Sequence, residues 1–322
     1  MPLTFKDVRR LFQVPTKGRV RLRDYDPGWA ADKELQELTK DELKARAKEF
    51  LAHTVTDLAD AQERLYASDT HSVLIVLQAS DAAGKDGTIK HVMTGVNPQG
   101  CQVFAFKKPS SEELDHNFLW RYMRALPERG RIGIFNRSYY EDVLVVRVHP
   151  ELVNLPSGKK GRKEFWEDRY DDINQFERHL TRNGTLVLKF FLNVSKKEQG
   201  KRFMERLENP EKFWKFSFGD LDERKHWDEY QDAFENMIQH TSTEWAPWWV
   251  VPADHKYVTR ALVAGIITRA IDDLGVAFPE VSEEKRQRFG AAKADLLADG
   301  VKPKGKKKKK KDAEVATEEE ER

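Results

Sequence analysis

Residues 72–88 read SVLIVLQASDAAGKDGT, and this stretch decides the fold. Its first seven residues form a continuous apolar run rich in β-branched side chains, which is typical of a buried parallel strand. The loop that follows contains Gly84 and Lys85 and leads into a helical pattern. Backbone N–H groups at a helix N-terminus, together with a lysine, are the arrangement that binds phosphate. The stretch therefore predicts a phosphate-binding loop between the first strand of a sheet and a helix.

The loop departs from the usual pattern G-x-x-x-x-G-K-[ST] at two positions. Ala79 replaces the first glycine, and Asp86 stands where a serine or threonine would hold Mg²⁺. Asp81 could take over the metal, because carboxylates are good ligands for Mg²⁺. The alternative is an ordinary strand-to-helix turn that Asp81 merely caps. On the first interpretation Asp81 is the metal ligand, and the phosphate-binding residues are Ala82, Ala83, Gly84, Lys85, Asp86 and Gly87.

Four further strand-like runs follow, separated by helical patterns. The strand-like runs cover 102–106, 131–135, 185–194 and 248–251, and helical patterns cover 39–66, 86–95, 112–126, 164–182, 195–240, 254–274 and 282–298. This alternation predicts an α/β protein, with a three-layer α/β/α domain around a mainly parallel five-stranded sheet. We expect an irregular N-terminal arm over 1–38, the α/β domain over 39–298, and a disordered tail over 299–322 that is rich in lysine and ends in acidic residues.

The overall charge is nearly balanced, but its distribution is not. The 322 residues include 56 Lys and Arg and 54 Asp and Glu, with a formal net charge of +2. Residues 302–322 contain nine basic and six acidic residues, leaving 47 basic and 48 acidic residues in 1–301. An anion site must therefore come from local clustering. The tail favours a solvated segment, with polyanion contact as the alternative.

No segment has the ~20 apolar residues that a membrane-spanning helix needs. The N-terminus lacks the apolar stretch of a secretion signal. The lone Cys101 excludes an intramolecular disulfide framework and fits a reducing compartment. We therefore expect a cytoplasmic protein.

A polar stretch follows the strand-like run 131–135. It begins with Asn136 and Arg137 and continues to Glu141 and Asp142. Ligands of open α/β sheets bind beyond the carboxyl ends of the strands, where both this stretch and the phosphate loop lie. Asn136 could orient a metal-bound water, and Arg137 could stabilise a phosphoryl group in transfer. The alternative for Arg137 is a surface salt bridge with Glu141, one helical turn away.

The segment 195–240 begins with a capping box, Ser195-x-x-Glu198, and carries several basic residues. Arg202 and Arg206 are spaced to lie on one helix face, and Lys212 and Lys215 follow. Beside a phosphate loop this favours a lid that closes over phosphates, about 195–230. Taken alone, the interleaved glutamates would favour a solvated helix.

Together these pieces resemble the family-2 polyphosphate kinases over about Tyr25 to Leu274. The resemblance rests on the loop 81–87, on Phe135-Asn-Arg-Ser138, and on the lid motif Ser195-Lys-Lys-Glu-Gln199 with Arg202-Phe203 and Arg206-Leu207. It also includes Trp227-Asp-Glu-Tyr230, Thr241-Ser-Thr243 and Ala246-Pro-Trp248. Each piece is short, but their order and spacing together are specific.

The resemblance implies a P-loop kinase fold with a helical lid, and transfer of phosphoryl groups between inorganic polyphosphate and nucleotides with Mg²⁺ or Mn²⁺. It implies that Asp81 helps to hold the metal and that Lys85, Arg137 and Arg206, with Arg202 beside it, act on the phosphates. Asn136, where some members have Asp, resembles the branch that phosphorylates both AMP and ADP. The second metal carboxylate stays open between Glu141 and Asp142. Homodimers or homotetramers are also implied.

The sequence thus predicts a kinase that uses polyphosphate to convert AMP to ADP and ADP to ATP. Asp81, Lys85, Arg137 and Arg206 are the predicted catalytic residues. The donor groove would be lined by Lys85, Arg137, Arg202, Arg206 and Lys215, and the nucleotide bound by Asn136, Arg137 and Glu141. The substrates would be adenine nucleotides, with guanine nucleotides as a second option, and nucleic acid is not expected. The alternatives are an ATP-dependent nucleoside monophosphate kinase and a non-enzymatic polyanion-binding protein.

Overall fold

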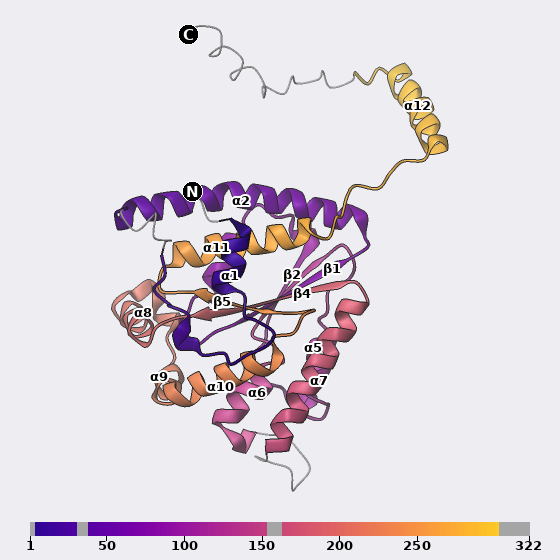
Figure 1. Ribbon diagram of the computed structural model, residues 1–322. Helices are drawn as coiled ribbons and strands as arrows, with labels where there is room; N and C mark the ends of the chain where they lie inside the picture. Colours follow the sequence, from indigo (N-terminus) through magenta and orange to yellow (C-terminus); the bar gives the residue numbers. More distant parts are fainter. Residues whose placement is uncertain (1–3, 31–37, 153–162, 303–322) are drawn as a thin grey trace. The chain divides into compact units, whose positions relative to one another are not determined.

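The computed structural model describes residues 4–30, 38–152 and 163–302 and divides into two units, residues 1–278 and 279–322. The first unit is built on five parallel strands in the order β2-β3-β1-β4-β5 (Figure 1). They are β1 (Ser72–Gln78), β2 (Cys101–Ala105), β3 (Ile132–Asn136), β4 (Thr185–Asn193) and β5 (Trp248–Pro252). The predicted three-layer α/β/α architecture is confirmed.

Each face of the sheet carries its own apolar core. Val73, Ile75 and Leu77 of β1 pack with α1 (Phe5–Phe12), α2 (Lys40–Ser68), α3 (Lys85–Val92) and α11 (Lys256–Asp272). Leu74 and Val76 face the opposite core, which includes side chains of α5 (Trp120–Met123), α6 (Glu141–Val148), α7 (Lys163–Arg182) and α10 (Trp227–Thr241). Because β1 is buried on both faces, its sequence is apolar throughout rather than alternating.

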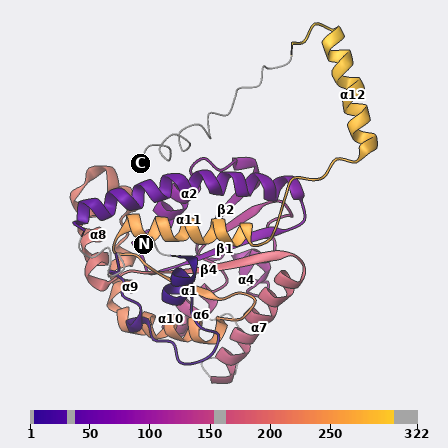
Figure 2. The same cartoon turned by 45° about the horizontal axis from the view of Figure 1, so that its top comes forward.

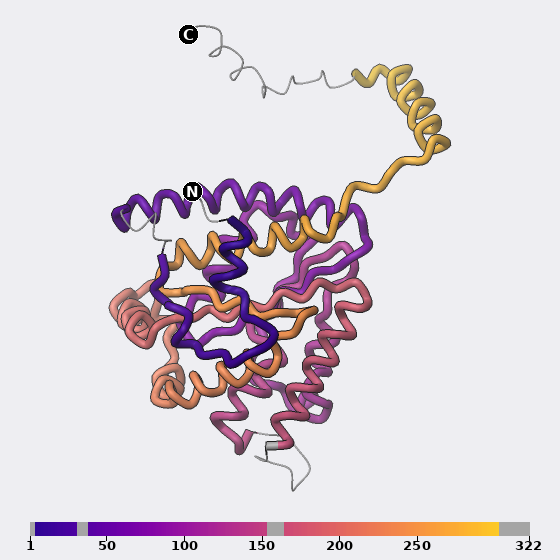
Figure 3. Tube along the Cα trace, in the orientation of Figure 1, coloured from indigo at the N-terminus to yellow at the C-terminus, as the bar shows by residue number. Residues whose placement is uncertain are grey.

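The N-terminal segment packs against the edge of the sheet beside β5. Figure 3 shows this indigo segment running past β5 toward α10. The Val14 N–H donates to the Trp248 carbonyl at 2.8 Å, and the Leu22 N–H, in the 3₁₀ turn η1 (Leu22–Asp24), donates to Glu235 at 2.8 Å. The sequence predicted an irregular arm, but the structure contains α1, which Thr4 caps with a capping box.

The segment 195–240, predicted as one helical stretch, consists of four pieces. Figures 1 and 2 show α8 (Lys196–Glu208) and α9 (Phe218–Lys225) together at one end of the sheet. A 3₁₀ turn, η5 (Pro210–Lys215), joins them, and α10 follows α9. Pro210 has no N–H to donate, and Asn209 and Ser217 cap the N-termini of η5 and α9. The helix is therefore interrupted at both places. We call 196–225 the lid segment.

Two further helices differ from the prediction. The pattern at 112–126 forms two four-residue helices, α4 (Ser111–Leu114) and α5, instead of one. Helix α6 was not predicted, and it begins directly after the polar stretch at the end of β3. Short 3₁₀ turns complete this unit: η3 (Pro98–Gly100) precedes β2 and η4 (Pro150–Leu152) follows α6.

The second unit contributes α12 (Glu283–Ala298), which confirms the helix predicted at 282–298 and has no buried residue. Residues 303–322 of the predicted tail lie outside the described residues. Among the helices described, none is long and apolar enough to cross a membrane.

Candidate active site

The loop between β1 and α3 has the geometry of a phosphate cradle. Gly84 is the N-cap of α3 and has φ 110°, and Ala82 has φ 57°. Glycine adopts a positive φ without strain, so Gly84 suits this N-cap position. Helix α3 therefore starts with free N–H groups at the carboxyl end of the central strand, where anions bind.

Lys85 lies beneath this loop and is buried. Its Nζ donates to the carbonyl of Ala79 at 2.9 Å. Burial, assisted by the positive charge of Arg137, lowers the pKa of Lys85 to about 8. A bound phosphate would reverse this shift, because an anion next to the ammonium favours its charged form.

The end of β3 meets the phosphate loop. The parallel register pairs Leu77 with Asn136, so both strands finish at the same edge. Asn136 Nδ2 donates to Asp86 at 2.6 Å, and Arg137 Nη2 lies 2.8 Å from Asp81 Oδ1. The alternative partner of Arg137, Glu141, also contacts it, at 3.4 Å.

Arg137 itself has a strained backbone with φ 65°. Its N–H donates to Leu77 O at 3.1 Å, which holds this conformation against β1. The negative charge of Glu141 is the main cause that raises the pKa of Arg137. The guanidinium remains 40% exposed and is therefore accessible to a ligand as well as to its two carboxylates.

A buried polar cluster supports the segment that carries Arg137 and Glu141. Lys189 Nζ lies 2.6 Å from Glu177 Oε2, and both side chains are fully buried. Glu177 Oε1 accepts hydrogen bonds from the hydroxyls of Tyr139 and Tyr140 at 2.8 and 2.7 Å. Because every member has a partner, the cluster fixes residues 138–141 between α7 and β4.

Arg202 of α8 is almost completely buried against the phosphate loop. Its Nη1 donates to the carbonyls of Ala82 and Ala83 at 3.0 and 2.6 Å, and its Nη2 donates to Ala253 at 2.6 Å. Glu198 accepts from its Nε at 3.0 Å. Its donors are therefore directed at the protein itself, so the geometry favours a role in holding the loop.

Arg206 and Lys215, the other predicted lid cations, are placed differently. Arg206 Nη1 lies 3.2 Å from Asp220 Oδ2 and donates to the Lys215 carbonyl at 3.0 Å. The Lys215 side chain is exposed, with its ammonium 4.9 Å from the Trp214 ring. The structure thus brings together Asp81, Lys85, Arg137 and Glu141, while Lys215 lies at the surface of the lid segment.

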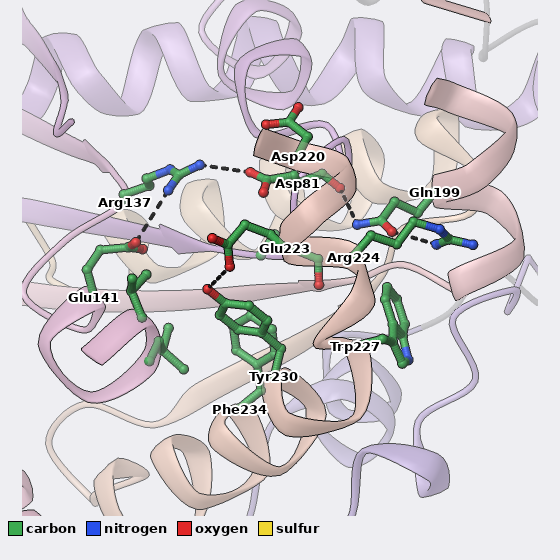
Figure 4. A pocket seen from close by; sticks show the side chains of 14 residues that line it. Asp81, Arg137, Glu141, Gln199, Asp220, Glu223, Arg224, Trp227, Tyr230 and Phe234 are labelled. Carbon is green, nitrogen blue, oxygen red and sulfur yellow. Dashed lines mark hydrogen bonds and ion pairs between the residues drawn. The ribbon is translucent and has the colours of Figure 1, made fainter. Parts of the chain in front are cut away.

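A first pocket lies between the phosphate loop and the lid segment (Figure 4). Gln199 Nε2 donates to the Asp81 carbonyl at 3.0 Å, and Arg224 Nη1 donates to Gln199 Oε1 at 2.7 Å. Tyr230 donates to Glu223 at 2.6 Å. Sequence reasoning assigned no role to these side chains. Gln199 and Tyr230 fell within quoted motifs, but Arg224 had no signal beyond its position in the lid.

A second, larger pocket opens on the other side of Arg137 and Glu141. Both residues line it as well as the first pocket. Its lining combines aromatic and aliphatic side chains with many charged ones. The aromatic side chains are Phe106, Phe118, Tyr122 and Phe165, and the charged ones include Arg121, Asp142 and Arg169. Apolar walls with converging polar groups are typical of a small-molecule site.

The carboxylate oxygens of Asp81 and Asp220 suit a divalent cation such as Mg²⁺. Two carboxylates do not complete its coordination, so oxygen atoms of a bound ligand would have to supply the rest. Among the described residues, no group of three His, Cys, Asp or Glu side chains is close enough to hold a metal. Asp81 and Asp220 line the same pocket, and burial and then the negative charge of Asp81 raise the pKa of Asp220. A cation between them would relieve this repulsion, and carboxylate oxygens suit Mg²⁺.

Comparison with known proteins points to one family. Residues 40–278 match the family model described as polyphosphate kinase 2. An ADP-polyphosphate phosphotransferase of Rhodopseudomonas palustris is 51% identical over 80% of this chain and 90% of its own length. An AMP/ADP-polyphosphate phosphotransferase of Meiothermus ruber is 45% identical over 85% of this chain and 97% of its own. The crystal structure of polyphosphate kinase 2 from Arthrobacter aurescens superposes with a TM-score of 0.79 at 38% identity, covering 91% of this chain and 96% of that one.

Proposed function

Because the chain belongs to the polyphosphate kinase 2 family, we propose that it is a phosphotransferase that moves phosphoryl groups from inorganic polyphosphate to AMP and ADP. The products are ADP, ATP and a polyphosphate shortened by one unit. The observation that carries this proposal is the meeting of two pockets at Arg137 and Glu141, next to the phosphate loop. The first pocket lies at the phosphate loop and contains Arg137 and Arg224, and the second contains aromatic side chains on which a base can stack.

The donor occupies the first pocket, between the phosphate loop and the lid segment. Polyphosphate carries about one negative charge per unit, so its end needs N–H donors and cations rather than an apolar surface. Arg137 and Arg224 line this pocket, and the N-terminus of α3 with Lys85 lies next to it in the phosphate loop. Arg202 contributes indirectly, because it fixes the carbonyls of Ala82 and Ala83 and thereby the path of the loop.

The acceptor nucleotide occupies the second pocket, with its phosphate at Arg137 and its base between the aromatic walls. An oxygen of that phosphate attacks the terminal phosphorus of the donor. A new P–O bond forms as the bond to the next phosphate of the chain breaks. The attacking oxygen is already ionised, so no strong base is needed, and catalysis comes from positioning and from neutralising charge.

Mg²⁺ or Mn²⁺ would be held by Asp81, with Asp220 of the lid segment in the same pocket, and would neutralise charge on the phosphates. Asp81 is also the partner of Arg137. Arg137 therefore keeps the carboxylate oriented toward the pocket. The lid segment, held to the loop by Gln199, excludes water that would otherwise hydrolyse the donor.

The deciding experiment supplies the purified protein with AMP, Mg²⁺ and polyphosphate in the absence of ATP. We expect ADP and then ATP to appear, followed by chromatography. Asp81→Asn should abolish product formation, while Asp57→Asn, an exposed carboxylate on α2, should not. Formation of ADP only when ATP is added would instead favour an ATP-dependent nucleoside monophosphate kinase.

Two alternative functions, an ATP-dependent kinase and a polyanion-binding protein, make different predictions. The second pocket, with its aromatic side chains beside a phosphate loop, would also serve an ATP-dependent kinase. Polyanion binding without chemistry would survive Asp81→Asn and weaken with salt.

We further propose a homo-oligomer, as the family resemblance implies, and a cytoplasmic location, which suits the free Cys101.

A further inference from the structure

Two charged side chains, Lys189 of β4 and Glu177 of α7, form an ion pair inside the core. Their Nζ and Oε2 atoms lie 2.6 Å apart, and neither side chain is exposed. Burying two charges is costly, and replacing such a pair by apolar side chains of similar volume is often neutral or stabilising. Stability is therefore a weak reason for placing these charges here, and the contacts that the pair makes point to another role.

The hydrogen bonds of the pair reach beyond α7 and β4. Lys189 Nζ donates to the Tyr140 hydroxyl at 3.0 Å and to the carbonyl of Thr241, the last residue of α10, at 2.6 Å. Glu177 Oε1 accepts from the hydroxyls of Tyr139 and Tyr140. Both tyrosines are fully buried, and Tyr140 is the N-cap of α6. One ion pair thus connects α7, β4, the end of α10 and the start of α6.

The helices joined in this way form parts of the walls of both pockets. Tyr230 and Phe234 of α10 line the first pocket, and Phe165 and Arg169 of α7 line the second. Glu141, the first residue of α6, lines both. The position of one pocket relative to the other therefore depends on how α6, α7 and α10 are held together, and the buried pair contacts all three.

We propose that Glu177 is a positioning residue that anchors the segment 138–141 and so aligns the acceptor pocket with the donor pocket. Lys189 neutralises its charge and ties it to the end of α10. This rests on the proposed function, because it takes the transfer to occur where the two pockets meet. Since neither side chain is exposed, neither contacts a substrate, and Glu177 acts through Tyr139 and Tyr140.

Alignment should affect the rate of transfer more than the affinity for either substrate. The new P–O bond forms only where the attacking oxygen and the phosphorus are in line, and a misplacement of about 1 Å costs about a hundredfold in rate. Side chains at the pockets, such as Arg137 and Glu141, are still present when the anchor is removed. We therefore expect loss of the anchor to lower kcat and to leave KM for AMP and for polyphosphate nearly constant.

The double variant Tyr139→Phe with Tyr140→Phe removes the anchor and keeps the ion pair. The rings still fill the core, and Glu177 keeps Lys189 as its partner. We expect kcat for AMP with polyphosphate to fall by about tenfold, with both KM values within about twofold of the native ones. Thr268→Val removes a buried hydroxyl from α11, which packs on the opposite face of the sheet, and as the matched control it should change neither value.

A second double variant, Glu177→Gln with Lys189→Met, distinguishes the anchor from the charges. The amide oxygen still accepts from both tyrosines, and no buried charge is left without a partner, so kcat should stay within about threefold of the native value. A larger loss of kcat here than in the tyrosine variant would overturn the proposal, because the charges and not the anchor would then matter.

An unchanged kcat in the tyrosine variant would also overturn the proposal, and so would a rise in KM with kcat constant. Thermal melting shows whether each variant is folded under the assay conditions. Should the tyrosine variant not fold, the single changes Tyr139→Phe and Tyr140→Phe take its place, and at least one of them must lower kcat at constant KM. A native protein that forms no ADP from AMP and polyphosphate would instead refute the proposed function, so the two can fail separately.

Discussion

The phosphate loop and the lid segment converge on one edge of the sheet, but their cations are held there in different ways. Lys85 is placed by the backbone of its own loop, and its ammonium donates to a carbonyl six residues earlier. Arg202 is placed by carbonyls from two distant segments, 82–83 and 253–254. The contacts of Lys85 are local in sequence, whereas those of Arg202 are brought together by the fold. The Lys85 ammonium has three donors and directs two of them at its own loop, whereas the donors of Arg202 are directed at these carbonyls and at Glu198.

The largest effect should come from Lys85→Met. Removing the cation from the phosphate cradle should lower phosphorylation of AMP by about a thousandfold, as for other preorganised electrostatic groups. The fold should remain, because a buried ammonium is itself costly to bury. Product formation and thermal melting measure the two effects. Turnover within tenfold of the native protein would contradict the role of Lys85.

Arg202→Met and Arg206→Met sharpen the comparison within the lid segment. Arg202→Met leaves buried carbonyls and Glu198 without their donor, so it should lower the free energy of unfolding by about 3 kcal/mol. Arg206 pairs with Asp220 near the surface, so its loss should cost less than about 1 kcal/mol. Denaturant unfolding measures both.

The loss of turnover should be larger for Arg206→Met than for Arg202→Met, the reverse of the order expected for stability. After correction for the folded fraction, Arg206→Met should lower turnover by roughly tenfold if this guanidinium reaches the phosphates on closure. Arg202→Lys serves as a control that keeps the charge but cannot reach all four carbonyls. If Arg202→Met melts like the native protein and yet loses its polyphosphate binding, the structural assignment of Arg202 is wrong.

The same contrast explains what the sequence could predict. The strand 72–78 and the loop after it were readable because apolar periodicity, Gly84 and Lys85 are local signals. The five strands and their parallel arrangement followed from the same reasoning. Helix α6 was missed because its apolar residues continue a strand-like pattern of valines. Tertiary packing overrides that propensity.

The roles of the lid side chains were not readable in this way. The spacing of Arg202 and Arg206 predicts one helix face, and both do lie on α8. Which of them is buried depends on the carbonyls of Ala82 and Ala253, which are brought together only by the fold. Arg224 and Gln199 illustrate the same point, since their hydrogen bond joins two helices. Side-chain partners at long range leave no periodic signal.

The pH dependence of activity should report the protonation of Lys85 in the phosphate loop. Lys85 has its pKa lowered to about 8, so in the free enzyme it loses its charge as the pH rises through that value. We expect kcat/KM for polyphosphate to fall above about pH 8, because only the ammonium attracts phosphate. The limb in kcat should lie at higher pH, since bound phosphate raises the pKa again.

The contribution of Lys85 to the free energy of unfolding should rise over the pH range in which kcat/KM falls. Between about pH 8 and the usual lysine pKa of 10.5, the unfolded chain binds the proton that the folded protein has released. The contribution of Lys85 to the free energy of unfolding therefore rises with pH there. Lys85→Met should remove this contribution, and a limb in kcat/KM that persisted in Lys85→Arg would assign it to another group.

The smallest effect should come from Glu223→Gln, which weakens the hold of the lid segment on the rest of the site. Glu223 of α9 accepts from the Tyr230 hydroxyl at 2.6 Å and lies 3.0 Å from Nε2 of His149, just after α6. An amide keeps one hydrogen bond but loses the charge, so the closed lid should be less favoured. We expect KM for polyphosphate to rise about threefold with kcat nearly constant, because closure affects binding more than the transfer itself. Glu229→Gln, on an exposed carboxylate 3.6 Å from His226, is the matched control and should change neither value. A fall in kcat with KM unchanged would mean that Glu223 acts on the transferred phosphate, and the lid would then share the catalytic role that the comparison gives to the loop.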